Sequence, residues 1–300
     1  MKKRHISKRQ KRNTIAGYLF IAPFLISFFV FTLYPFVNSL YLSFTDYNIL
    51  SGSKWIGWDN YIKIFTDDPK IWNALKVTFK FALISVPLDL VVGLLVAIVL
   101  SIATKFTGIY RAFFYVPSLL GGTVAIAITW QQLWSKTGVF NQMLESMGLP
   151  TVNWLNDPRT ALYILMLLGT WQFGRPMLIY LAAIKDVPKS LMEAAIIDGA
   201  SSVQRFFKIT LPLITSTVFF NLVNGVIGSL QQYTSALLIT DGGPMQSTMF
   251  YGLYQYKQAF EYHHMGYAAA MAWVIMLIIL ALTALVFKSS GGWVYYQDEL

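Results

Sequence analysis

The apolar residues of this chain fall into six long blocks, not into the short alternating or amphipathic patterns of soluble elements. A helix needs about 20 consecutive apolar residues to cross a bilayer, and each block reaches that length. We therefore predict an all-α membrane protein with about six transmembrane helices. The predicted spans cover residues 15–44, 72–103, 109–134, 160–184, 208–238 and 265–288.

The composition of the chain agrees with a membrane protein. Hydrophobic residues make up 56% of the 300 residues, charged residues make up 12%, and the mean hydropathy is +0.53. Soluble domains carry about 25% charged residues. The sequence contains no cysteine, which excludes disulfide, zinc-thiolate and thiol redox chemistry.

The net charge of +9 would suit nucleic-acid binding, but the positions of the basic residues indicate membrane orientation instead. Seven of the 23 Lys and Arg residues lie in the first twelve positions, directly before an apolar block. This pattern holds an N-terminus in the cytoplasm. With six spans, fourteen basic residues fall in predicted inside segments and six in outside segments. We predict that the basic segment 1–14 and the tail 289–300 are both cytoplasmic.

The first apolar block is predicted to be a retained helix and not a cleaved signal peptide. A signal peptide has an apolar region of about 7–15 residues followed by a small-residue cleavage site. Here the apolar run begins at Ile15 and continues past Pro35 without such a site. Residues 15–70 are therefore expected to form the first transmembrane helix and an outside loop.

The longest predicted cytoplasmic loop, residues 185–212, carries the clearest local signals. Pro188 suits the first turn of a helix, and Gly199 suits a left-handed position at its end. Ser201 and Gln204 have the spacing of a capping box that opens another helix. The sequence predicts a short helix over 188–199, a sharp turn, and a second helix leading into the fifth span.

The motifs of this loop resemble the "EAA" loop of binding-protein-dependent ABC importer permeases. They read Glu193-Ala194-Ala195, Asp198-Gly199-Ala200 and Ile209-x-Leu211-Pro212. The resemblance implies a type I ABC importer fold over residues 71–288. It also implies that the 188–199 helix docks on a cytoplasmic ATPase subunit. The coupling residues it assigns are Glu193, Ala194, Ala195, Asp198 and Gly199.

Further stretches resemble the carbohydrate-uptake branch of these permeases, the maltose and glycerol-phosphate type. They are Trp55-Ile56-Gly57-x-Asp59-Asn60-Tyr61, Pro117, Trp130, residues 178–183, Thr240-Asp241-Gly242-Gly243-Pro244 and Gly266-Tyr267-x-x-Ala270. Asp241 departs from the pattern, in which glycine is usual. The resemblance implies a multi-pass protein of a prokaryotic cell membrane that takes a sugar or oligosaccharide from an extracellular binding protein.

The same resemblance implies the partners of the chain. They are a second, non-identical permease subunit and two cytoplasmic ATPase subunits that use ATP and Mg. The chain itself has no Gly-x-x-x-x-Gly-Lys-Ser/Thr loop for phosphate, so it is expected to bind no cofactor and to be no enzyme.

Polar residues inside the predicted spans are candidate functional residues, because ionisable groups in a bilayer are costly. Asp89 and Arg175 fall near mid-membrane and are predicted either to pair with each other or to meet the solute. The fifth span adds a group that suits a carbohydrate path or hydrogen bonds between helices. Its members are Asn221, Asn224, Gln231, Gln232 and Tyr233.

Three alternatives stay open at this stage. The same architecture imports glycerol phosphate or another small polar solute. An ion-coupled secondary carrier would show internal repeats and matching broken helices, neither of which the sequence indicates. A membrane enzyme would show a catalytic motif, and none is found. His263 and His264 have no ligand partner at metal spacing and are interpreted as loop residues.

Overall fold

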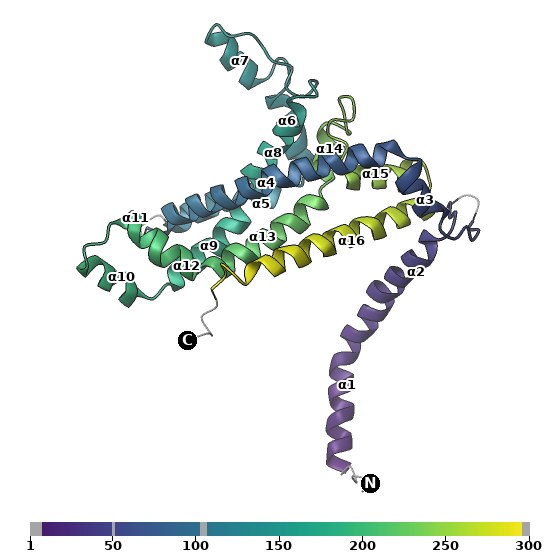
Figure 1. Ribbon diagram of the computed structural model, residues 1–300, viewed down its shortest axis with the longest axis horizontal. Helices are drawn as coiled ribbons and strands as arrows, with labels where there is room; N and C mark the ends of the chain where they lie inside the picture. The colour runs from purple at the N-terminus through teal and green to yellow at the C-terminus, as the bar shows by residue number, and fades with distance from the viewer. Residues whose placement is uncertain (1–7, 50–51, 103–106, 296–300) are drawn as a thin grey trace. The chain divides into compact units, whose positions relative to one another are not determined.

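The computed structural model describes residues 8–49, 52–102 and 107–295, and within these ranges the regular structure is helical with two isolated β-bridges (Figure 1). Several basic residues used to predict orientation lie outside the described residues. They are Lys2, Lys3, Arg4 and Lys105. The chain divides into two compact units, Met1–Asp67 with Gln258–Val274, and Asp68–Lys257 with Ile275–Leu300. Each unit is described by itself.

The helices of the described residues follow one another along the chain. They are α1 (Lys8–Phe28), α2 (Tyr34–Ser43), α3 (Asp59–Thr66), α4 (Pro69–Ser101), α5 (Thr107–Leu120), α6 (Val124–Leu133), α7 (Val139–Ser146), α8 (Ala161–Trp171), α9 (Gly174–Asp186), α10 (Lys189–Ile197), α11 (Ser202–Arg205), α12 (Leu211–Leu213), α13 (Thr215–Leu230), α14 (Thr234–Ile239), α15 (Tyr251–Tyr256) and α16 (Met265–Ser290).

Within the described residues, three helical segments are long and apolar enough to cross a membrane, which makes the chain a multi-pass membrane protein. They are Lys11–Ser43, which joins α1 and α2 through a π-helical turn, then α4 and α16. Two bent pairs raise the number to five if each counts as one span: α5 with α6, bent by 97°, and the α11–α12 segment with α13, bent by 66°. The first, second and sixth predicted spans are confirmed as long apolar helices.

The third, fourth and fifth predicted spans are not continuous helices, which corrects the sequence-based prediction. Gly121-Gly122-Thr123 interrupts the third, where the Thr123 side chain caps α6. The fourth breaks at Gln172–Phe173, between the short helices α8 and α9. The fifth bends at Ile214 and ends at residues 231–233. A hydropathy profile shows only that a segment is apolar. It stays high across a helix break, because a broken backbone is tolerated at membrane depth where neighbouring helices shield it from lipid.

The first unit is organised by the segment after α2. Phe44 packs on the rings of Trp55, Trp58 and Tyr61, with centroids 5.0–5.6 Å apart. The buried Asn60 donates hydrogen bonds to the carbonyls of residues 43 and 45, each at 2.9 Å. These contacts give the Trp55–Tyr61 motif a structural role.

The second unit is built around α4, which packs against α8, α9, α13 and α15. Two apolar clusters hold these helices together. One includes Phe81, Leu165 and Phe250, and the other includes Ala97 and Tyr180. These helices therefore form the packed core of the second unit, and the loops at both ends of α4 extend from this core.

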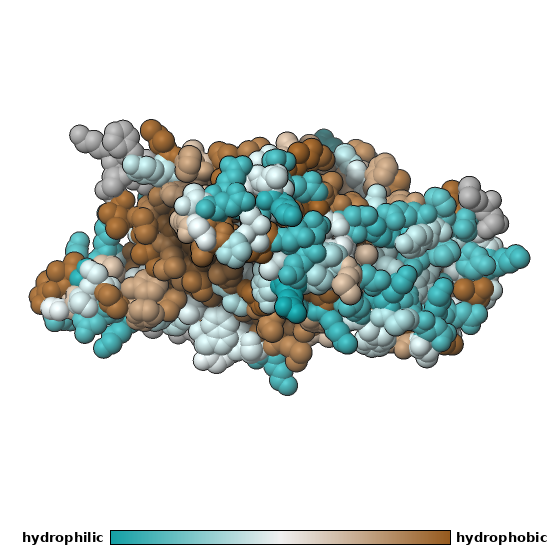
Figure 2. Space-filling view, turned by 90° about the horizontal axis from the view of Figure 1, so that it is seen from above, coloured by the Kyte–Doolittle hydropathy of each residue, from teal (hydrophilic) through white to brown (hydrophobic). Residues whose placement is uncertain are grey.

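Many large apolar side chains lie on the surface of this unit, as a lipid-facing protein requires. Leu83, Phe113 and Leu119 are 78%, 72% and 63% exposed. In the space-filling view of the molecule, broad areas of hydrophobic residues lie at the surface (Figure 2). Soluble monomers rarely expose apolar patches of this kind.

Candidate functional site

The predicted coupling helix is present as α10, which begins after Pro188 and ends at Asp198. Gly199 has a φ of +77°, in the left-handed region, as its position after the helix predicted. The Ala200 amide donates to the Ala195 carbonyl at 2.9 Å, a bond that closes the end of the helix. The predicted bounds of 188–199 are therefore confirmed to within two residues.

The predicted capping box is also present, at the start of α11. The Gln204 amide donates to the Ser201 hydroxyl at 3.3 Å, and the Ser201 amide donates to the Gln204 side chain at 2.8 Å. A π-helical turn over residues 206–210 then leads into α12. The chain thus leads from α10 through α11 and α12 into α13, the main helix of the fifth predicted span.

Arg205 stabilises the turn between α10 and α11 by hydrogen bonds. This role was not predicted from the sequence. Its Nη1 donates to the Ala200 carbonyl at 2.8 Å, and its Nη2 donates to the Ser202 hydroxyl at 3.1 Å. No local motif indicates this contact, because an arginine five residues after a backbone carbonyl forms no recognised capping pattern. Two bonds from one guanidinium hold the turn rigid.

The helix α10 projects from the unit and contains no buried residue. Glu193, Ala194 and Asp198 are exposed, and Ala195 is half-buried. Beside them, Ile197 is 85% exposed. Figure 1 shows α10 and α11 at one end of α4, with α15 at the other end. Leu191 and Ile196 of the same helix are also exposed, and apolar side chains that gather on a projecting helix are suited to docking on another protein.

If α10 docks on an ATPase subunit, as the resemblance to importer permeases implies, we expect Arg205→Met to weaken that coupling several-fold in the full complex, because the Ala200 carbonyl loses its charged donor while the side-chain stem is kept. Such a bond contributes roughly 1.5–3 kcal/mol. ATP hydrolysis stimulated by loaded binding protein is the measurement. Lys208→Met is the control, since exposed Lys208 makes no hydrogen bond or ion pair within the described residues. Equal losses in the two variants would show that only the charge matters.

Asp89 and Arg175 do not form the predicted ion pair, which corrects that hypothesis. No hydrogen bond or ion pair joins them among the described residues, and Arg175 is exposed at the start of α9. Asp89 instead faces Thr170 of α8. Its Oδ1 and the Thr170 hydroxyl are both buried without a hydrogen-bond partner in the described chain. The pairing prediction was wrong because it used only the depth of the two residues in the membrane. The rotation of each helix about its own axis decides which side chains face each other.

Apart from Arg175, the predicted solute path consists of five polar residues of the fifth predicted span, which separate into two groups. Asn221 is buried in α13, against Tyr180 of α9, while Asn224 is exposed one turn later. Residues 231–233 form the connection from α13 to α14, where the Tyr233 ring stacks on Tyr256 at 5.8 Å. The structure does not bring the five together as one cluster.

Two of the helix breaks meet, and this junction was also missed by sequence reasoning. The Ser118 hydroxyl of α5 donates to the Gln172 carbonyl at 2.7 Å, which joins the first break to the second. A Cβ at Gly121 would overlap the Gln172 amide. A Cβ at Gly174 would lie 2.9 Å from the Phe114 carbonyl. The only available signal was the glycines themselves, which mark close approach without naming the partner.

A multi-pass helical protein with broken spans and a projecting loop at one end of its core has the general form of a membrane component of a transport system. The comparison with known families agrees: residues 83–290 match the family described as "Binding-protein-dependent transport system inner membrane component". The chain belongs to this family. The resemblance to ABC importer permeases is therefore confirmed.

The chain is similar over nearly its whole length to several bacterial permeases. It is 47% identical to the "Probable ABC transporter permease protein YesP" of Bacillus subtilis, covering 98% of this chain and 96% of that protein. It is 32% identical to the "Lactose transport system permease protein LacF" of Rhizobium radiobacter, covering 95% and 97%. A chain of a solved bacterial alginate ABC transporter, in complex with an alginate-bound periplasmic protein, shares the fold. Its TM-score is 0.82 at 22% identity, with 94% of this chain and 96% of that chain covered.

Proposed function

We propose that this chain is the membrane-spanning permease subunit of an ATP-driven importer that moves a sugar or oligosaccharide into the cytoplasm. The observation that carries the proposal is α10, a projecting helix without buried residues that ends in the exposed Ile197 and a fixed left-handed turn. In this proposal Glu193, Ala194, Ala195, Asp198 and Gly199 form the docking surface for an ATPase subunit. The end of the core that carries α10 faces the cytoplasm, as the distribution of basic residues predicts.

The partners follow from the same proposal. ATP and Mg are used by two cytoplasmic ATPase subunits, because the chain has no phosphate-binding loop of its own. A second, non-identical permease completes the pore, and an extracellular binding protein delivers the solute. The relatives named for lactose and for arabinooligosaccharides support a saccharide as the solute.

Two other functions are weaker proposals. Import of glycerol phosphate or another small polar solute would use the same architecture. An ion-coupled carrier is favoured by one observation, the broken helices, since such carriers bind solute where helices unwind. It leaves the projecting α10 without a role.

The test is ATP hydrolysis in proteoliposomes that hold the full complex. We expect the sugar-loaded binding protein to stimulate hydrolysis, and Ile197→Asp to reduce stimulation to the unstimulated level, because a charge replaces the apolar side chain at the contact. Ile197→Leu, which keeps an apolar group of equal size, is the matched control and should retain stimulation. Uptake that persists without ATP and follows an ion gradient would contradict the proposed function.

A further inference from the structure

The segment that follows α16, residues 291–295, folds back onto the start of α13, at the place where the fifth predicted span bends. We call it the return segment, and it belongs with α13 to the second unit. The chain turns after α16, where the Trp293 amide donates to the Ser290 carbonyl at 3.1 Å. The Tyr295 amide then donates to the Thr215 hydroxyl at 2.9 Å. The return segment is therefore tied to the first residue of α13.

Thr215 lies directly at the bend, where the axis of the α11–α12 segment and the axis of α13 differ by 66°. Such a break interrupts the regular hydrogen bonds of a helix and leaves carbonyls without their usual amide donors. The Thr215 hydroxyl donates to the Pro212 carbonyl at 2.8 Å, and the same oxygen accepts the Tyr295 amide. One hydroxyl therefore joins both sides of the bend to the return segment.

A contact between aromatic rings supports this hydrogen bond. Phe219 lies one turn after Thr215 on the same face of α13, and its side chain is buried. Its ring meets the Phe287 ring of α16 edge-on, with centroids 4.9 Å apart, and the Trp293 ring with centroids 6.0 Å apart. Rings at such distances and angles attract each other beyond the burial of their apolar area. The hydrogen bond and the ring contact thus hold the return segment at two points one helical turn apart.

The return segment lies at the surface, whereas the bend beneath it is buried. Trp293 is 40% exposed and Ile214 is 2% exposed. Neither α10 nor α11 contains a buried residue, so the direction in which they project depends on the angle of this bend. Bends at the ends of helices are the positions that absorb changes of φ and ψ when helices move. A surface contact at the bend can therefore fix its angle without being part of the packed core.

We propose that the return segment fixes the angle between the α10–α12 loop and α13, and that Thr215 and Trp293 are the positioning residues through which it does so. The inference rests on the proposed function, in which α10 meets an ATPase subunit. It goes further by assigning a role to a segment outside both the docking surface and the predicted solute path. With the segment in place, α10 and α13 move as one piece. Without it, the bend absorbs a movement of α10 before α13 is displaced.

The experiment measures the position of α10 and the coupling of the full complex on the same preparations. The chain has no cysteine, so Ser190→Cys on α10 and Ala284→Cys on α16 accept spin labels without removal of other thiols from this chain. Both positions are exposed. Pulsed electron paramagnetic resonance in nanodiscs then gives the distribution of distances between the two labels. ATP hydrolysis stimulated by loaded binding protein is the second measurement.

Thr215→Val keeps the shape of the side chain and removes the hydroxyl. We expect it to broaden the distance distribution and to lower stimulated hydrolysis about fivefold, the effect of one lost hydrogen bond. Thr215→Ser, which keeps the hydroxyl, should retain both properties of the unmodified complex. Trp293→Ala should act in the same direction as Thr215→Val. The double variant should be little worse than either single variant, because both changes release the same segment.

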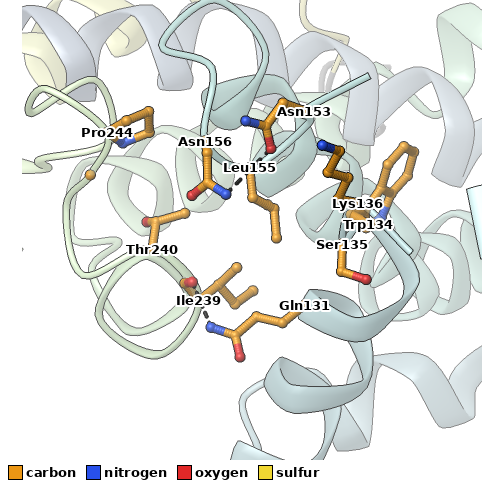
Figure 3. Close-up of a pocket in the computed structure, with 11 residues that line it drawn as sticks. Gln131, Trp134, Ser135, Lys136, Asn153, Leu155, Asn156, Ile239, Thr240 and Pro244 are labelled. Carbon is orange, nitrogen blue, oxygen red and sulfur yellow. Dashed lines mark hydrogen bonds between the residues drawn. The ribbon is translucent and has the colours of Figure 1, made fainter. Parts of the chain in front are cut away.

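Two controls separate the position of α10 from the stability of the protein. Thr217→Val makes the same substitution two residues later in α13, where the hydroxyl forms no hydrogen bond within the described residues, and should change neither measurement. Gln131→Leu removes a bond elsewhere in the unit, in which Gln131 Nε2 donates to the Ile239 carbonyl at 2.6 Å (Figure 3). It should lower the unfolding temperature and leave the distances between the labels unchanged.

The inference is wrong if Thr215→Val and Trp293→Ala both leave the distance distribution and stimulated hydrolysis unchanged. It is also wrong if Thr217→Val has the same effect as Thr215→Val, or if hydrolysis falls while the distances stay the same. Absence of stimulation in the unmodified complex would reject the proposed function instead. The distances would still test the return segment in that case, because their measurement requires no transport.

Discussion

Replacing Gly199 by valine is expected to reduce coupled ATP hydrolysis about tenfold, because a β-branched residue held in the left-handed region carries strain of about 1–3 kcal/mol. Gly199 has a φ of +77° and no atom lies within 4 Å of a Cβ built there. The effect is therefore one of backbone conformation and not of crowding. The turn would relax and move α10 from the position in which, in the proposed function, its exposed face meets the ATPase.

Asparagine at the same position is the matched control, since Asn adopts the left-handed conformation more readily than other non-glycine residues. Gly199→Asn should retain most of the coupling, and both variants should keep the spans folded by circular dichroism. Hydrolysis and uptake by the complex are the measurements. Full coupling in Gly199→Val would contradict the proposed role of α10 as the docking element.

Alanine at Gly174 is expected to give the largest loss of stability, lowering the free energy of unfolding by about 1–3 kcal/mol through overpacking. The first turn of α9 lies directly against α5. A Cβ at Gly174 would be 2.6 Å from the Ser118 hydroxyl and 2.9 Å from both the Phe114 carbonyl and the Tyr115 Cα. Two of these three atoms belong to the backbone, which cannot move out of the way by a change of rotamer as a side chain can.

Gly228→Ala is the control for this prediction and should act in the opposite direction. Gly228 lies within α13, and nothing is within 4 Å of a Cβ built there. Alanine in a helix interior is more stable than glycine by about 0.5–1 kcal/mol. Thermal unfolding in detergent distinguishes the two variants. A Gly174→Ala protein as stable as Gly228→Ala would mean that α5 and α9 are not in close contact in the membrane.

The helix breaks affect how such a permease could move. Ser118 and Gln172 join the break of one bent pair to the break between α8 and α9. Helices that are interrupted at one level can bend there while their halves stay rigid, and hinge positions of this kind absorb large changes of φ and ψ. The two breaks are therefore expected to move together and not independently.

The coupling loop was predictable in detail because its signals are local. A proline start, a left-handed glycine and a capping box each act through backbone groups a few residues away, so Pro188, Gly199, Ser201 and Gln204 determine the loop wherever it sits. The membrane class was equally predictable, since the number of consecutive apolar residues is a property of the sequence alone.

The tertiary structure decided everything that depends on how helices are rotated and where they break. It separated Asp89 from Arg175, set Asp89 against Thr170, and gave Arg205 a place at the turn. The sequence could not indicate these results, because hydropathy measures whether a helix prefers lipid and carries no information about which neighbour each of its faces meets.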